Sequence, residues 1–220
     1  MNEGGTWLRS WRFAITATAA FALAFIAAHW IDYAVVNALY TRDLYDEDWA
    51  KAFRSVGYLP VWVVFAVGLF LTDRLRYRGQ GLKLKLRRAA LVVSATVVAG
   101  LLAELFKMLL RRNRPRFHLD HHTFRSWAHD FWSTAGFGLP SSHTTVAFAG
   151  AAAMSLLFPR HAVLWLLAAT GCAYSRIANS DHFPSDVILG AFVGCATAWA
   201  LWARFFHLRE DTGLPPLNSC

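Results

Sequence analysis

Long apolar runs separated by short polar segments make up most of this chain. Six runs are apolar over enough residues to span a bilayer, or nearly so: 13–28, 59–72, 89–110, 144–158, 162–174 and 187–206. Several fall short of the roughly 20 residues that a spanning helix needs, so flanking aromatic residues must extend them into the membrane interface. The pattern predicts an all-α fold, an integral membrane bundle of six transmembrane helices.

The first run follows Arg9 and Arg12, and a cleaved signal peptide is a competing interpretation. A retained helix is favoured, because the apolar character continues past Ala28 and places Trp30 and Tyr33 near an interface.

The segment 42–58, between the first two runs, differs in character. Four acidic residues precede four apolar ones: Asp43, Asp46, Glu47 and Asp48, then Trp49, Ala50, Phe53 and Val56. This order is typical of a short amphipathic helix on the membrane surface. A solvated connector fits the same residues, so both interpretations stand.

Composition and charge narrow the class of protein. The 220 residues are 56% hydrophobic with a formal net charge of +8, which a soluble domain rarely combines. The densest basic cluster, 74–88, predicts a cytoplasmic loop. Counting helices from it places the loops 32–58, 111–143 and 175–186 on the periplasmic or extracellular face of a cell (inner) membrane, with both termini cytoplasmic. The chain 1–220 is interpreted as one membrane domain without a nucleic-acid partner, and its oligomeric state stays open.

The outer loop 111–143 is itself basic, against the charge rule. It contains Arg111, Arg112, Arg114, Arg116 and Arg125. Basic residues kept on the unfavoured side indicate a use, and we expect them to bind anionic headgroups.

Three short stretches carry residues suited to phosphoryl transfer. They are Lys107 with Arg114-Pro115, then Pro140-Ser141-Ser142-His143, then Ser175-Arg176 followed by His182 and Asp186. Three cations can match the charge of a phosphate and of its transition state, and two histidines remain for covalent and proton-transfer work. Because the predicted topology puts all three stretches on one face, they can form one site.

The first stretch is predicted at the end of a helix. Lys107 and Arg114 are two turns apart and share a face as long as the helix persists, which Pro115 predicts to be until about Asn113. Glu104, one turn before Lys107, is interpreted as its counter-ion rather than as a catalyst, because an unpaired carboxylate in hydrocarbon is costly.

The other two stretches are predicted to begin helices. Ser141 is a preferred N-cap, and the free N–H groups at such a start bind anions. Pro184 suits the first turn of the last helix. Asp186 lies four residues past His182, close enough to accept a proton from its imidazole and fix the tautomer. Asp181 is expected to point elsewhere.

The three motifs, in this order and with these spacings, resemble the type 2 phosphatidic acid phosphatase family of lipid phosphatases. The resemblance covers the second half of the chain, with a catalytic part of about 104–190. One departure is visible: Ser142 stands where the family usually has Gly, so a backbone conformation that only Gly tolerates is in question. Its hydroxyl could instead add a donor to the phosphate.

The resemblance implies a role for each motif residue. His182 would be the nucleophile, Asp186 would orient it, His143 would protonate the leaving oxygen, and water would hydrolyse the phosphohistidine. The implied phosphate-binding residues are Lys107, Arg114, Ser141, Ser142 and Arg176. No metal or other cofactor is expected, because three side-chain cations supply the charge that magnesium supplies elsewhere.

The implied partner is a membrane lipid phosphate in the bilayer. Phosphatidylglycerol phosphate, undecaprenyl diphosphate, phosphatidic acid and lipid A phosphates are all candidates. Transfer of the phosphoryl group to a lipid hydroxyl would use the same residues. A transporter or scaffold is the non-enzymatic alternative, and it predicts charges spread through several helices rather than gathered at their outer ends. Six membrane spans argue against the related vanadium haloperoxidases.

A second cluster in the outer loop superficially resembles a zinc site. It consists of His118, His121, His122 and His129 with Asp120 and Asp130. The spacing matches no standard zinc motif, so substrate contact or a hydrated loop is the favoured interpretation.

Overall fold

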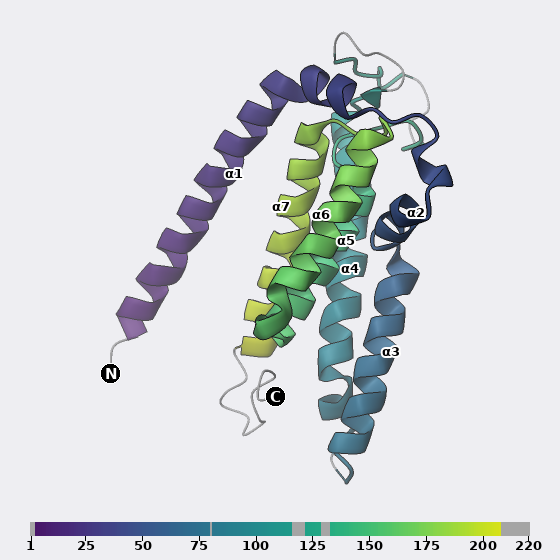
Figure 1. The fold of residues 1–220 in the computed structure, drawn as a ribbon. Coiled ribbons are helices and arrows are strands. Elements are labelled where there is room, and N and C mark those ends of the chain that lie inside the picture. Colours follow the sequence, from purple (N-terminus) through teal and green to yellow (C-terminus); the bar gives the residue numbers. More distant parts are fainter. Residues whose placement is uncertain (1–2, 80, 116–121, 129–132, 208–220) are drawn as a thin grey trace.

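Helices make up nearly all of the computed structural model, which describes residues 3–79, 81–115, 122–128 and 133–207 (Figure 1). The helices are α1 (Glu3–Leu39), α2 (Asp48–Ser55), α3 (Leu59–Arg76), α4 (Leu82–Leu110), α5 (Ser142–Leu157), α6 (Ala162–Ala178) and α7 (Pro184–Leu201). Short 3-10 turns at Leu44–Asp46 and Pro159–His161 and a π-helical turn at Trp202–His207 complete the elements. Within these residues the backbone forms only isolated β-bridges, and the predicted all-α class is confirmed.

Three helices are individually long and apolar enough to cross a membrane: Ala14–Leu39, Lys85–Leu110 and Pro184–Arg204. The pair α2 and α3 passes the same test only together, bent by 65° at the break. With 16 and 17 residues, α5 and α6 reach only about 25 Å of the roughly 30 Å of hydrocarbon. The structure therefore gives three to four candidate spans, and the predicted six are not confirmed.

Helix α5 lies at the centre of the bundle and packs against α4, α6 and α7. Its core positions are small, with Ala147, Ala149, Ala151 and Ala153 all fully buried. Small side chains let neighbouring helices approach closely, which is common between helices in membranes. Around them the core extends to Trp62 of α3 and the start of α4.

The bundle brings the three motif stretches to one end (Figure 1). The segments 111–115 and 179–183 lie there with the turn between α1 and α2, while the α3–α4 turn and the start of α1 lie at the other end. Helix α1 runs to Leu39, well past the predicted run at 28, and leans away from the bundle at its start. The predicted helix within 42–58 is present as α2.

Candidate active site

The first stretch leaves its helix earlier than predicted. Helix α4 ends at Leu110 because Arg111 adopts a left-handed conformation with φ 51°. Arg114 therefore lies beyond the helix and does not share a helical face with Lys107, contrary to the prediction. The interpretation of Glu104 as a counter-ion is confirmed, since its Oε1 lies 3.0 Å from Nζ of Lys107.

Ser141 caps α5 as predicted, although loosely. Its hydroxyl oxygen accepts from the backbone N–H of Thr144 at 3.5 Å, and its own N–H donates to the carbonyl oxygen of Asp186 at 3.1 Å. Ser142 is an ordinary first helical residue, so no conformation reserved for Gly is needed. Its hydroxyl donates to Glu104 at 2.6 Å, which joins it to the ion pair of Lys107.

His182 lies buried in the turn between α6 and α7. Its Nδ1 is 2.9 Å from the carbonyl oxygen of Gly138, which can only accept, so Nδ1 carries the proton and Nε2 holds a lone pair. Burial lowers the pKa of His182 to about 3, and the positive charge of Arg176 adds to this effect. The imidazole is therefore neutral at physiological pH.

Asp186 is close to His182, but its nearest partners are other groups. Its Oδ2 lies 3.6 Å from Nδ1 of His182, longer than a hydrogen bond, and 2.8 Å from the backbone N–H of Phe183. The sequence predicts that the imidazole N–H of His182 donates to Asp186, but in the structure this N–H donates to the carbonyl oxygen of Gly138. The other carboxylate oxygen of Asp186 forms a buried ion pair with Arg112.

Arg112, which sequence reasoning placed only among headgroup-binding residues, is part of a buried network. It donates to Ser185 Oγ at 2.8 Å as well as to Asp186, and Nη1 lies 3.8 Å from Asp32 of α1. Asp32 also accepts from the backbone N–H of Ser185 at 2.9 Å and from its hydroxyl. A carboxylate in the apolar stretch that continues past Ala28 was the signal that could have identified Asp32.

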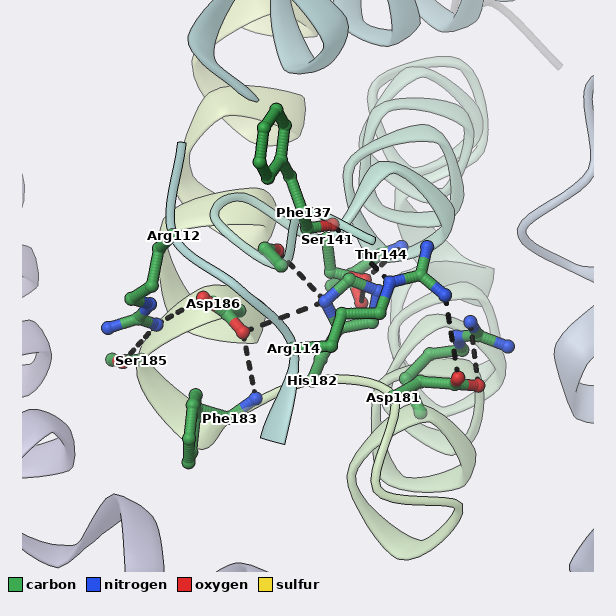
Figure 2. A network of polar contacts seen from close by, with 12 residues as sticks. Arg112, Arg114, Phe137, Ser141, Thr144, Asp181, His182, Phe183, Ser185 and Asp186 are labelled. Atoms are coloured by element: carbon green, nitrogen blue, oxygen red, sulfur yellow. Dashed lines mark hydrogen bonds and ion pairs between the residues drawn. The ribbon is translucent and has the colours of Figure 1, made fainter. Parts of the chain in front are cut away.

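The two arginines of the first and third motifs share a carboxylate. Asp181 lies 2.8 Å from Nη2 of Arg176 and 3.6 Å from Nη1 of Arg114. The expectation that Asp181 points elsewhere is wrong, because the turn between α6 and α7 directs it toward the arginines (Figure 2). Tyr45 adds a further contact, since its hydroxyl oxygen accepts from Nη1 of Arg176 at 2.7 Å.

Two of the five loop arginines do not face headgroups. Arg111 and Arg112 are 1% exposed; Arg111 donates to the carbonyl oxygens of Arg125 and Ser126 and stacks on Phe137. Arg111 thus holds the loop together from within, whereas Arg112 ties it to α7 and α1. Arg116 lies outside the described residues.

Of the predicted histidine cluster, only His122 lies within the described residues, where it contacts Asp32 at 3.1 Å. With His29 these residues place three potential ligand atoms within 4.8 Å of one another. The arrangement fits a metal poorly, because the rings of His29 and His122 stack face to face and the cation Arg112 lies 3.8 Å from Asp32. The expected absence of a metal stays a prediction.

In the assembled site, His182 lies between Asp186 on one side and Arg114 with Asp181 on the other (Figure 2). The site combines a neutral imidazole with an available lone pair and several cations, which is suited to an anionic electrophile such as a phosphate. His143, at the start of α5, has a buried Nε2 without a hydrogen-bond partner among the described residues.

Comparisons with known proteins agree with this chemistry. A Lipid A 1-phosphatase of Rhizobium johnstonii is 36% identical over 121 residues, and one of Rhizobium etli is 36% identical over 129 residues. The matches cover 52% and 56% of this chain and 49% and 55% of the relatives, so the chain spans about half the length of the curated relatives it matches.

A solved structure and a family model were also matched. The crystal structure of Aquifex aeolicus LpxE is 21% identical with a TM-score of 0.37, over 68% of this chain and 92% of that chain, which is too distant to support a fold assignment. The model of the PAP2 superfamily matches residues 88–210, more than half of the chain, and this range holds all three motifs. The chain therefore belongs to the PAP2 superfamily, the family that its three motifs resemble.

Proposed function

We propose that this protein is a membrane-bound lipid phosphatase that hydrolyses a phosphomonoester or diphosphate on a lipid headgroup. The observation that carries the proposal is the neutral, buried His182, with its Nε2 lone pair available beside Arg114 and its other nitrogen bonded to the carbonyl oxygen of Gly138. A neutral imidazole held in this tautomer is a competent nucleophile toward phosphorus.

In the proposed reaction, Nε2 of His182 forms a bond to phosphorus as the bond to the lipid oxygen breaks. The negative charge of the bound phosphate favours the protonated form of His143, which otherwise is neutral like His182. His143 then gives this proton to the lipid oxygen, and the lipid leaves as an alcohol, or as a phosphate when the substrate is a diphosphate. Water then attacks the phosphohistidine, with His143 taking the proton, and inorganic phosphate leaves. Lys107, Arg114 and Arg176 stabilise the charge on the phosphoryl oxygens, with Ser141 and the backbone of Ser142 as further donors.

The proposed substrate is the 1-phosphate of lipid A, because the curated relatives carry that activity in their names. Phosphatidylglycerol phosphate, phosphatidic acid and undecaprenyl diphosphate are the competing substrates. The proposed site faces the periplasm from an inner membrane that the chain crosses six times, with α5 and α6 extended by interfacial residues and both termini in the cytoplasm. The basic α3–α4 turn supports this orientation.

Phosphate release from a panel of these lipids by the purified protein tests the proposal. We expect the highest kcat/KM on lipid A 1-phosphate. The His182→Ala variant should lose at least about a thousandfold in kcat, because the nucleophile is gone. His161→Ala is the matched control, since His161 is an exposed histidine in the turn before α6. Wild-type-like turnover by His182→Ala would remove the covalent mechanism, and phosphate appearing on an added lipid alcohol would identify a transferase.

A further inference from the structure

Helix α2, which precedes the matched family range, is held tightly against the site. A Cβ on Gly57 would lie 2.7 Å from Cβ of His143, so the turn after α2 touches this residue directly. A Cβ on Gly171 of α6 would lie 2.2 Å from the ring of Phe53. Both separations are shorter than real Cβ contacts, so only glycine permits this approach. Helix α2 therefore packs directly against α6, and the turn after α2 packs against the start of α5.

Arg54 lies on α2 between two tyrosines that contact predicted site residues. Its guanidinium carbon is 4.5 Å from the ring centre of Tyr45 and 5.7 Å from that of Tyr58. The hydroxyl of Tyr45 binds Arg176, as described above. The ring of Tyr58 meets that of His143 edge to face, with centroids 5.0 Å apart. Arg54 is thus one aromatic ring away from the proposed general acid and one from a proposed phosphate-binding arginine.

Charge distinguishes Arg54 from the other cations of the site. Each of the others has a carboxylate within ion-pair distance: Glu104 for Lys107, Asp181 for Arg114 and Arg176, and Asp186 for Arg112. Among the described residues, Arg54 has ring contacts and no carboxylate partner. Within the described part of the chain its Nε, like those of Arg112 and Arg176, is buried without a hydrogen-bond acceptor. A buried donor on a cation is costly unless an acceptor reaches it, and Arg54 lacks the carboxylate that offsets this cost at the other cations, so an anionic ligand that reached Arg54 would remove the cost.

We propose that Arg54 is a further substrate-binding residue, which binds an anionic oxygen of the lipid headgroup next to His143 and Arg176. This inference rests on the proposed function and deepens it. It assigns a ligand contact to a helix that lies before residue 88, outside the matched family range. Stacking on Tyr45 and Tyr58 fixes the planar guanidinium, which suits it to hold an anionic oxygen in one orientation.

Kinetics of Arg54→Gln against the lipid phosphate test the inference. We expect KM for the lipid to rise about tenfold or more, because a charge-assisted contact is lost. If Arg54 binds the reacting phosphate itself, the inhibition constant of orthovanadate should rise as well. If Arg54 binds a neighbouring anionic group of the headgroup, KM should rise for the lipid but not for a small soluble phosphate monoester. Either pattern supports the contact. Arg54→Lys, which keeps the charge, should recover part of the loss.

Lys51→Gln is the matched control, because it removes one positive charge from the exposed side of the same helix. It should leave KM within about twofold of the wild type. Arg54→Gln with unchanged KM and vanadate inhibition, or a loss that appears only as lower thermal stability, would overturn the inference and leave Arg54 a packing residue. If the wild type turns over none of the lipids, the proposed function fails by itself. Binding of lipid A 1-phosphate and of orthovanadate to the wild type and to Arg54→Gln, measured by calorimetry, then decides the role of Arg54: weaker binding of either ligand by the variant supports the contact, and equal binding of both overturns it.

Discussion

Asp186 is nearer to Arg112 than to the histidine that it is expected to orient. The ion pair with Arg112 offsets much of the negative charge that would otherwise raise the basicity of His182. Asp186 also accepts from the backbone N–H of Phe183, which fixes its position at the start of α7. We therefore expect Arg112 to act as a positioning residue, which determines where the carboxylate of Asp186 lies and how much negative charge it presents to His182.

Replacing Arg112 by Gln tests this role. The variant keeps a donor for Ser185 but removes the charge, so Asp186 becomes an uncompensated anion beside His182. We expect kcat to fall about 10- to 100-fold, the range for outer partners of catalytic groups, and the pKa of His182 to rise. The pH profile of kcat/KM should therefore lose activity at a higher pH than the wild type does. A lower melting temperature with an unchanged pH profile would mean that Arg112 only stabilises the fold.

The pH dependence of the wild type checks the state of His182. Its pKa of about 3 lies below the ordinary value of about 6.5, so the neutral nucleophile persists as the pH falls and is lost only near pH 3. We expect no loss of kcat/KM attributable to His182 between about pH 7 and pH 5, after correction for the ionisation of the substrate. A tenfold fall per pH unit that begins near 6.5 would contradict the burial argument.

Predictions from capping, proline and charge-pair rules are confirmed where the interacting residues are close together in the sequence. The cap at Ser141, the Pro184 start of α7 and the pairing of Glu104 with Lys107 all lie within a few residues along the chain. The contacts of Asp32 with Ser185 join residues 153 apart, and no periodicity or spacing encodes them. Asp181 escaped prediction for another reason, since its direction depends on the turn at Ser180, where φ is 53°.

At the scale of elements, the apolar runs predicted where the long helices lie, but not which of them are long enough to span the membrane. The runs predicted α5 and α6, yet 16 and 17 residues leave each helix short of the hydrocarbon thickness. The alternating directions of α5, α6 and α7 place the starts of α5 and α7 and the end of α6 together at one end of the bundle. That shared end is the feature on which the proposed topology depends.

Cysteine labelling tests on which side of the membrane this end lies. In a background with Cys220 replaced by Ser, Ala128→Cys places a thiol on the exposed loop near the site, and Leu82→Cys places one at the opposite end. An impermeant maleimide should label the first thiol and not the second in spheroplasts, since the basic α3–α4 turn favours the cytoplasm. Labelling of the second alone would put the site in the cytoplasm.

At the scale of the whole molecule, basic side chains outnumber acidic ones, and several of the basic side chains lie around His182. A divalent ion would be repelled there unless carboxylates offset the charge, and Asp181, Asp186 and Glu104 are already paired with side-chain cations. This distribution of charge favours a phosphatase that needs no metal.

Excess EDTA should therefore leave phosphate release unchanged, while orthovanadate should inhibit it by resembling the five-coordinate transition state. A metal-dependent phosphatase under the same chelator serves as the positive control. If turnover stopped in EDTA and returned with zinc, the group of His29, Asp32 and His122 would become the candidate metal site. The assigned roles of Lys107, Arg114 and Arg176 would then have to be revised.

The contact of Asp32 with Ser185 has a consequence for how the gene can be divided. A fragment that begins at residue 82 would keep every motif residue and the whole matched range, yet it would lack the carboxylate that Asp32 of α1 supplies to Ser185 and Arg112. Such a fragment should insert and fold poorly, with little activity. Co-expression of residues 1–79 as a separate chain should restore turnover, and the same partner with Asp32→Ala should not. Split-gene complementation would thus report on a single buried carboxylate.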